Sequence, residues 1–426
     1  MIKRILYTLL IMFPVLASAQ INTDRVMAIG RNALYFEDYV LSIQYFNQVI
    51  NAKPYLSDPY FYRGLAKINL DDFQGAESDC SEAIERNPFV VSAYQVRGLA
   101  RIQQNNFAGA IEDYTKALEF DPENIGVWHN MALCRIRQED YKGAKNDLDK
   151  LIAISPRYTK AYLMRGEVDL KQKDTLAAEK DFGKAIEIDR YDADTWASRA
   201  ILRLQQQRYK DAEADFDHAI RLSTRNSGVY INRALARYHQ NNLRGAMSDY
   251  DIALDIDPNN FIGHYNRGLL RAQVGDDNRA IQDFNFVIEM EPDNMMAIFN
   301  RGLLLDQTGD YKGAIKDYST VINEYPNFLL GYQYRAQARR KIGDVKGADA
   351  DEFKVLKAQL DKQNGVDPNK QTADNTENNK TRKKSDKNMN NYRKIVVADN
   401  EEGEEKYKSD YRGRVQDKNV NIVPQP

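Results

Sequence analysis

The chain places its apolar residues with the period of an α-helix. They recur three and four positions apart within 94–102 and again within 107–118, and the polar pair Asn105-Asn106 separates the two runs. This spacing predicts two amphipathic helices joined by a short turn.

The same pattern returns every 34 residues. A Gly or Ala marks each copy, and the markers are Gly30, Gly64, Gly98, Ala132, Gly166, Ala200, Ala234, Gly268, Gly302 and Ala336. An Ala follows twelve positions later in nine of these ten copies, and a Pro closes most of them. A fixed period of this length predicts a stack of repeats, here numbered one to ten, because one copy is too small to bury its apolar face alone.

The markers identify a family resemblance. In repeat three the aromatic, small, Ala, aromatic, Ala and Pro positions are filled by Tyr94, Gly98, Ala110, Tyr114, Ala117 and Pro122. This pattern resembles that of the tetratricopeptide repeat (TPR) family, and about ten copies cover roughly residues 22–361. The resemblance implies an all-α fold, a right-handed superhelical solenoid of about ten tetratricopeptide helical hairpins. Its concave groove would be lined by the first helix of each repeat.

The beginning of the chain differs from the repeats. A basic start and an apolar run at 5–16 precede Ala17-Ser18-Ala19, whose small residues suit signal peptidase cleavage before Gln20. We expect residues 1–19 to be a signal peptide and the mature protein to be exported, either periplasmic or secreted and associated with the outer envelope. The run is too short to be a comfortable permanent membrane anchor, so no transmembrane span is expected in the mature chain.

The end of the chain differs as well. No Leu, Phe or Trp occurs in 362–426, where Asn, Lys, Asp and Glu dominate. Such a composition cannot bury enough surface to fold alone. We therefore assign 20–361 to the TPR array and 362–426 to a disordered charged tail. Two interpretations of the tail stay open: it is simply solvated, or 394–397 and 411–423 are short motifs that order on a partner.

Charges at 349, 351, 354 and 357 predict a polar outer face for the last helix of the array.

Charged residues replace apolar ones at two positions of the family pattern. An Arg directly precedes the marker in eight repeats, and an Asp follows it by fifteen positions in the same eight. The pairs are Arg63 and Asp79, Arg97 and Asp113, Arg165 and Asp181, Arg199 and Asp215, Arg233 and Asp249, Arg267 and Asp283, Arg301 and Asp317, and Arg335 and Asp351. Repeat four has Met131 with Asp147 instead. A guanidinium can form two parallel hydrogen bonds with a carboxylate, so we interpret the eight as structural ion pairs between the helices of a repeat. An anion track or acid/base site is the alternative, but recurrence in repeat after repeat favours architecture.

The composition offers little other chemistry. Lys and Arg number 60 against 62 Asp and Glu, which gives no strong field for nucleic acid. The four His are scattered without metal-ligand spacing. Cys80 and Cys134 lie more than a repeat apart and are expected to be buried and unpaired. The sequence predicts no catalytic residue, metal site or cofactor, and the protein is not expected to be an enzyme.

The binding site is then expected in the groove that the resemblance implies. The family's groove positions correspond to Asn130, Asn232, Asn266 and Asn300, with Tyr238, Tyr265 and Phe299 beside them. An Asn offers a donor and an acceptor, so a row of them can hold the backbone of an extended peptide. The alternative is that these amides only solvate a polar face. We expect a non-catalytic exported scaffold for a protein or peptide partner in or near the cell envelope, with partner and oligomeric state open. A receptor for a small ligand or glycan, held by the groove aromatics, is the second candidate.

Overall fold

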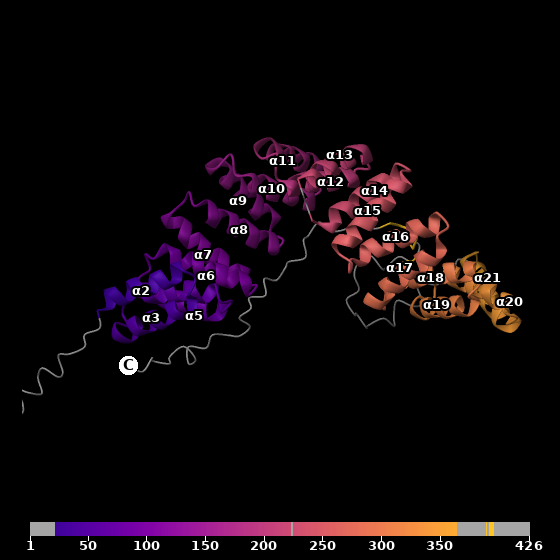
Figure 1. The fold of residues 1–426 in the computed structure, drawn as a ribbon, viewed down its shortest axis with the longest axis horizontal. Helices are drawn as coiled ribbons and strands as arrows, with labels where there is room; N and C mark the ends of the chain where they lie inside the picture. The colour runs from indigo at the N-terminus through magenta and orange to yellow at the C-terminus, as the bar shows by residue number, and fades with distance from the viewer. Residues whose placement is uncertain (1–21, 223–224, 364–388, 390–391, 396–426) are drawn as a thin grey trace, which may run out of the picture. The chain divides into compact units, whose positions relative to one another are not determined.

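The computed structural model describes residues 22–222, 225–363, 389 and 392–395. In these residues the regular elements are twenty α-helices, and each of the ten repeats contributes two of them joined by a tight turn (Figure 1). The all-α prediction is therefore confirmed. The expected signal peptide and most of the expected tail lie outside the described residues.

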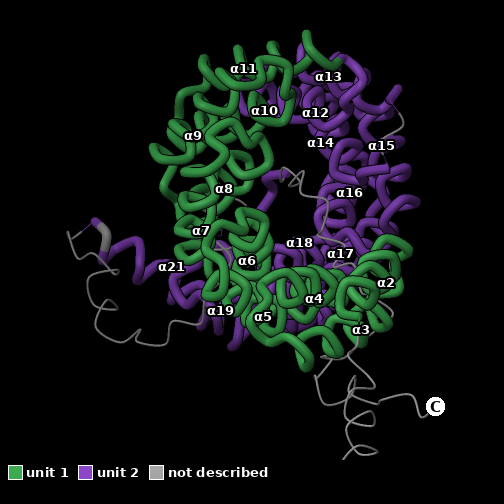
Figure 2. The backbone as a smooth tube through the Cα atoms, turned by 90° about the vertical axis from the view of Figure 1, so that its left-hand side faces the viewer, with its two compact units in different colours: residues 1–189, 403–426 green, residues 190–402 purple. Residues whose placement is uncertain are grey.

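The helices fall into two compact units (Figure 2). In unit 1, up to Asp189, repeats one to five supply α2 (Thr23–Tyr35), α3 (Tyr39–Ala52), α4 (Asp58–Ile68), α5 (Phe73–Arg86), α6 (Val91–Gln103), α7 (Phe107–Phe120), α8 (Ile125–Arg137), α9 (Tyr141–Ile154), α10 (Thr159–Lys171) and α11 (Thr175–Ile188). In unit 2, from Arg190, repeats six to ten supply α12 (Ala193–Gln205), α13 (Tyr209–Arg221), α14 (Ser227–His239), α15 (Leu243–Ile256), α16 (Phe261–Gln273), α17 (Asp277–Met290), α18 (Met295–Thr308), α19 (Tyr311–Glu324), α20 (Leu329–Lys341) and α21 (Val345–Gln363).

The marker residue is small because a large side chain of the second helix fills the space beside it. A Cβ added to Gly166 would lie 2.5 Å from the ring of Phe182, and one added to Gly302 would lie 2.9 Å from Tyr318. Both rings are fully buried. The close approach of the two helices within a repeat therefore depends on the marker, and a larger residue there would push the helices apart.

The turn between the two helices has the same geometry in every repeat. The residue seven positions after the marker adopts a positive φ, and it is a Gly in the last three repeats, at Gly275, Gly309 and Gly343. The next residue precedes the second helix. In eight repeats it is an Asp or Asn that accepts a hydrogen bond from a backbone N–H of the first turn, as Asp174 does from Ala177 and Asn242 from Gly245. Repeat six has Arg208, whose side chain makes no capping bond.

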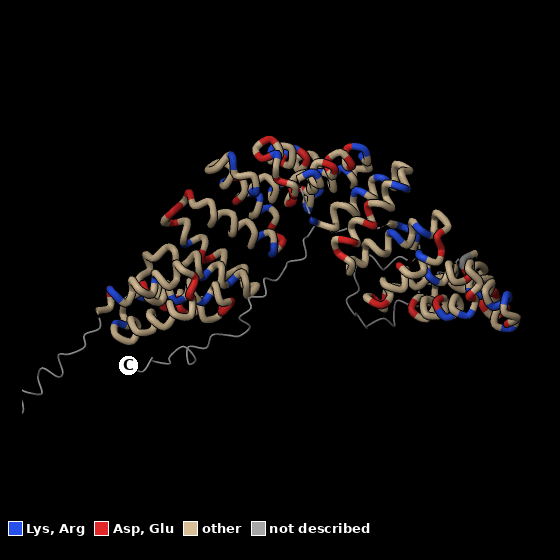
Figure 3. Tube along the Cα trace, in the orientation of Figure 1, with Lys and Arg blue, Asp and Glu red and all other residues tan. Residues whose placement is uncertain are grey.

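The eight expected pairs of Arg and Asp are in contact in every repeat concerned. Each guanidinium forks onto its carboxylate, and the Nη2–Oδ1 distances are 2.5–2.8 Å. All eight carboxylates are buried. Figure 3 shows basic and acidic positions interspersed along the helices of each unit.

The third nitrogen of most of these guanidinium groups reaches back to the preceding repeat. Its acceptor lies sixteen positions before the Arg on the second helix of that repeat, and the pairs are Arg63 with Asn47, Arg97 with Ser81, Arg165 with Asp149, Arg233 with Asp217, Arg267 with Asp251, Arg301 with Asn285, and Arg335 with Ser319. One side chain therefore connects both helices of its own repeat with the repeat before.

A second basic residue also pairs with the buried Asp, and our sequence interpretation did not include it. A Lys or Arg three positions after the marker binds the same Asp in seven repeats, and these residues are Lys67, Arg101, Arg135, Arg203, Arg237, Arg271 and Arg339. The recurrence of a base at this position is visible in the sequence and is the signal that would have found it.

The end of the array is not the polar face that the sequence suggested. On α21 the side chains of Phe353, Leu356 and Leu360 are all exposed. Phe353 occupies the position from which earlier repeats offer an acceptor to the next Arg, such as Ser319 to Arg335. The charges that we had assigned to this face did not exclude the apolar residues between them, and Asp351 is itself buried against Arg335.

The pKa of the buried Asp depends on the number of its cationic or hydrogen-bonding partners, and among repeats three, four and eight, repeat four has the fewest. In repeat eight Asp283 has three partners. Burial raises its pKa, but His264, Arg267 and Arg271 outweigh that effect and lower the pKa overall. Asp113 has two cationic partners, Arg97 and Arg101, and burial raises its pKa. Asp147 has Arg135 alone as a cationic partner, and burial raises its pKa to about 7.

Replacement of Met131 with Arg should restore the missing contact. Thr115 lies 4.0 Å from the Met131 sulfur, where Ser81 receives Arg97 one repeat earlier, so an Arg at 131 should bridge Thr115 and Asp147. A raised pKa in the folded state means that the stabilisation from Asp147 is complete below about pH 4 and is lost as the pH rises through 7. We expect M131R to lower this pKa and to remove that loss. Hydrogen exchange of α8 and α9 between pH 4 and 8 should then show an advantage of the variant that grows with pH.

Met131→Leu is the matched control and should keep the pH dependence of the natural protein. Parallel pH profiles for M131R and the natural protein would show that the missing partner does not cause the shift.

The uncapped turn of repeat six offers a separate test. Arg208→Asn should supply the side-chain acceptor that Asn242 supplies in repeat seven, and it should raise the free energy of unfolding of unit 2 by about 1 kcal/mol. The exposed ion pair of Arg208 with Asp211 that is lost contributes little. The reciprocal change, Asn242→Arg, should cost a similar amount in denaturant titrations. If Arg208→Asn gives no gain in the free energy of unfolding and Asn242→Arg gives no loss, capping does not limit the stability of this turn.

Candidate functional site

The groove residues predicted from the sequence fall into two places. Asn130 is half-buried on α8 and belongs to unit 1. The remaining six belong to three successive first helices of unit 2, and they are Asn232 and Tyr238 on α14, Tyr265 and Asn266 on α16, and Phe299 and Asn300 on α18. Five of these six are buried, and Tyr238 is partly exposed.

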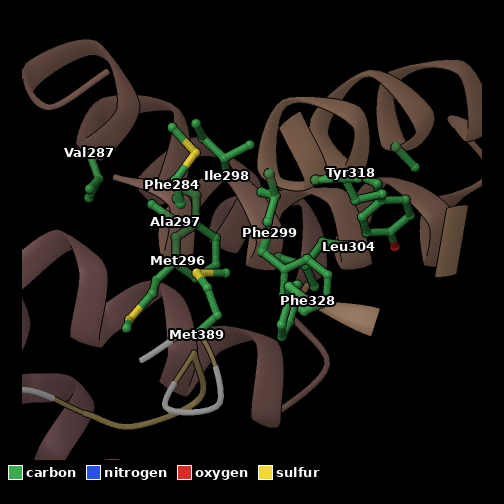
Figure 4. Packing of buried hydrophobic residues seen from close by; sticks show 14 of the residues in the cluster. Phe284, Val287, Met296, Ala297, Ile298, Phe299, Leu304, Tyr318, Phe328 and Met389 are labelled. Atoms are coloured by element: carbon green, nitrogen blue, oxygen red, sulfur yellow. The ribbon is translucent and has the colours of Figure 1, made fainter. Parts of the chain in front are cut away.

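A segment from the end of the chain covers part of this surface. Its described residues are Met389 and 392–395, which belong to unit 2. We call them the tail segment. Met389 is 5% exposed and lies in the apolar cluster that α16 to α20 form. In Figure 4 its side chain rises from the loop into this cluster beside Met296.

The backbone of Tyr392 is held by two of the predicted groove residues. Its carbonyl oxygen accepts a hydrogen bond from the Tyr265 hydroxyl at 2.8 Å and another from the Asn300 side-chain amide at 2.6 Å. The Asn300 amide also donates to the carbonyl of Met296 on its own helix, at 2.9 Å, which fixes the orientation of the side chain. Two donors from adjacent repeats thus converge on one main-chain acceptor.

The ring of Tyr392 is bound as well. It meets Phe299 edge to face, with ring centroids 4.8 Å apart and an interplanar angle of 89°. Burial raises the pKa of its phenol, although Arg393 opposes this. The ring therefore binds as a neutral aromatic group.

Further along the tail segment, Ile395 packs against a second apolar cluster. This cluster comes from α12 to α14 and includes Ala197, Phe216 and Val229, with Tyr238 at its margin. Arg393 and Lys394 are exposed. The tail segment thus faces the repeats with apolar residues at every third position, Met389, Tyr392 and Ile395. The two basic residues between Tyr392 and Ile395 face the solvent.

The predicted site is therefore assembled in part. Tyr265, Phe299 and Asn300 contact the tail segment directly, and Tyr238 contributes to the cluster that Ile395 meets. Asn232 and Asn266 are completely buried rather than spread along an open face. The N–H of Tyr392 donates to the carbonyl of Met389 at 3.3 Å, so the tail segment is not the fully extended peptide that the sequence analysis expected. The role of Met389 was missed, since a lone Met among charged residues carries no pattern of its own.

The two Cys and the side chains that could bind a metal ion are the remaining candidates for reactive chemistry among the described residues. Both thiols are free and buried, as predicted, and burial raises the pKa of Cys80 and of Cys134 to about 12. Within residues 22–222 and 225–363 and the tail segment, no group of three or more His, Cys, Asp or Glu side chains is arranged to hold a metal ion. Among the described helices, none has the length and apolar character needed to cross a membrane.

Known repeat families match the sequence across both units. A family described as TPR repeat matches 98–134, and two described as Tetratricopeptide repeat match 125–158 and 159–192, and 198–261 and 265–327. The chain is a tetratricopeptide repeat protein. TPR arrays are typically scaffolds for protein interactions and typically lack catalysis. No curated protein matches the sequence significantly.

Solved structures of other TPR proteins resemble this one. A tetratricopeptide repeat protein from Parabacteroides merdae is 21% identical, with 58% of this chain and 98% of that chain covered and a TM-score of 0.46. The C-terminal part of a TPR repeat-containing protein from Cytophaga hutchinsonii is 18% identical, with 56% and 97% covered and a TM-score of 0.46. YrrB, described as a TPR protein with an unusual peptide-binding site, is 20% identical, with 43% and 95% covered and a TM-score of 0.36.

The two donors to the Tyr392 carbonyl define a test of the site in this TPR protein. Asn300→Ala combined with Tyr265→Phe removes both hydrogen bonds, at roughly 1 kcal/mol each, and should loosen the tail segment about thirtyfold. Hydrogen exchange at the amides of 392–395 should accelerate accordingly while α16 and α18 keep their protection.

Asn69→Ala is the control, since the Asn69 amide donates to a carbonyl of its own helix in unit 1. Unchanged exchange at 392–395 in the double variant would show that the two hydrogen bonds do not retain the tail segment.

Proposed function

We propose that this protein is an exported, non-catalytic scaffold in or near the cell envelope, and that unit 2 binds a short peptide segment of a protein partner. One observation carries the proposal: Tyr265 and Asn300 converge on a main-chain carbonyl. Every peptide offers such a carbonyl, so a site that binds it recognises peptide as a class, while side-chain pockets beside it select the sequence. The export part of the proposal rests on the signal-like residues 1–19.

The apolar surroundings fit the same role. Phe299 is fully buried among the rings of Tyr318, Phe328, Tyr334 and Tyr392, at centroid distances of 4.8–5.9 Å. A sugar would need a free aromatic face on which to stack, and the neighbours of Phe299 occupy its surroundings. These contacts favour a peptide over the glycan receptor that we considered as the second candidate.

Selection of random peptides tests the proposal. The bait is the full mature chain with Met389→Asp and Tyr392→Ala, here called the released-tail variant, in which the two strongest anchors of the tail segment are removed. We expect phage-displayed peptides to be enriched, and their affinity to fall about fivefold when Asn300→Ala is added to this background, since one hydrogen bond of about 1 kcal/mol is lost. Fluorescence anisotropy measures both affinities.

Asn69→Ala on the same background is the matched control and should leave the affinity unchanged. The proposal fails if no peptide is enriched, or if the enriched peptides bind equally well without Asn300. Enrichment on a glycan array in place of peptides would support the receptor instead.

A further inference from the structure

The tail segment meets unit 2 through a defined pattern of contacts. Met389 enters the apolar cluster of α16 to α20, Tyr392 is held by its ring and by its carbonyl, and Ile395 meets the cluster of α12 to α14. The segment thus runs from later repeats toward earlier ones and has an anchor at every third residue. The residues directly after Tyr392, Arg393 and Lys394, point to solvent.

We propose that the tail segment is a resident ligand of the groove, which occupies the partner site in cis and displays the pattern that an external peptide must match to replace it. The pattern begins with an unbranched apolar or an aliphatic residue, at the position of Met389. An aromatic residue follows three positions later, as Tyr392 does, and an aliphatic residue three positions after that, as Ile395 does. The inference rests on the proposed function, since it names the chemistry of the partner for the same site.

The contacts are those of a reversible ligand rather than of a permanent part of the core. The segment contributes one buried side chain, one ring, the partly buried Ile395 and two neutral hydrogen bonds, and each such hydrogen bond is worth roughly 1 kcal/mol. Among the residues that the structure describes, no ion pair fixes it, and the guanidinium of Arg393 lies 5.3 Å from the ring of Tyr392, its own neighbour. Contacts of this kind give a free peptide only modest affinity.

Covalent linkage makes up for that modest affinity. Residues 364–388 join α21 to Met389, so the segment and its site belong to one chain. A linked ligand acts at an effective concentration on the order of 1 mM. If the free segment binds at about 100 μM, the cis copy weakens an external peptide of equal strength by about tenfold. A partner must therefore either match the pattern better than the tail segment does or be present in several linked copies.

The pattern also explains which positions of a bound peptide determine specificity. The carbonyl of Tyr392 is read by Tyr265 and Asn300, and any residue supplies a carbonyl. The middle position is nevertheless restricted, because its side chain must meet Phe299 edge to face. The two positions after it face solvent and tolerate most side chains.

The test compares the full mature chain with the released-tail variant. The probe is a fluorescein-labelled synthetic peptide with the sequence of residues 386–398, titrated by anisotropy. We expect the released-tail variant to bind the probe about tenfold more tightly than the natural chain. A probe with Tyr392→Ala should bind neither protein. Arg393→Ala with Lys394→Ala in the full chain is the matched control, and should leave the affinity at the natural value because these side chains are exposed.

The alternative results separate this inference from the proposed function. Equal binding of the probe by the natural chain and the released-tail variant would overturn the inference, since the tail would not occupy the site. Enriched peptides that depend on Asn300 but lack the three-residue pattern would overturn it as well, while the proposed peptide scaffold would stand. A tenfold difference for the probe without enrichment of any foreign peptide would leave the cis contact intact and defeat the proposed function.

The tail segment of a second molecule is the remaining occupant to test. Sedimentation of the natural chain over a hundredfold range of concentration should show no association that the released-tail variant lacks. A dimer that disappears in the released-tail variant would assign the segment to a second copy and would overturn occupation in cis.

Discussion

Burial of an aspartate between two helices is the constraint on which nine of the ten repeats depend. A carboxylate that loses its water is costly unless cations and hydrogen-bond donors replace that water. Here an Arg from the position before the marker forks onto the carboxylate, and in most repeats a second base joins it. The two helices can then approach in one register only, because any slip along the axis would leave the charge unpaired.

This constraint also orients the side chain of Asn300, which contacts the tail segment. Asn300 directly precedes Arg301, and neighbouring residues on a helix point about 100° apart. Because Arg301 must reach Asp317 on one side, Asn300 must project from another side of α18, where it meets the Tyr392 carbonyl. The third nitrogen of Arg301 reaches Asn285 of the preceding repeat and so fixes α18 against it. The ion pairs are structural, yet they determine where the binding amide points.

The sequence predicted the periodic features well and the unique ones poorly. The 34-residue period placed all ten helical hairpins, and the joint appearance of Arg and Asp placed them in contact, because both arguments use information that recurs. The tail segment occurs once. Its composition offered no period to follow, and docking needs only three apolar anchors on a site that the repeats have already formed. Asn232 and Asn266 were expected on an open face, and their complete burial depends on packing that the period does not describe.

Selectivity in a repeat protein has to arise where the repeats differ from one another. An Asn stands two positions before the marker in repeats seven, eight and nine, and the residue before it is Ile231, Tyr265 and Phe299 in turn. Repeats eight and nine therefore combine an amide with an aromatic ring, and the Tyr392 carbonyl is bound between these two. In repeat ten the Asn is replaced by Tyr334, whose ring lies 5.9 Å from that of Phe299 and adds to the apolar wall. The amide row ends where the aromatic wall begins, so the carbonyl and the ring of Tyr392 are fixed in both position and direction.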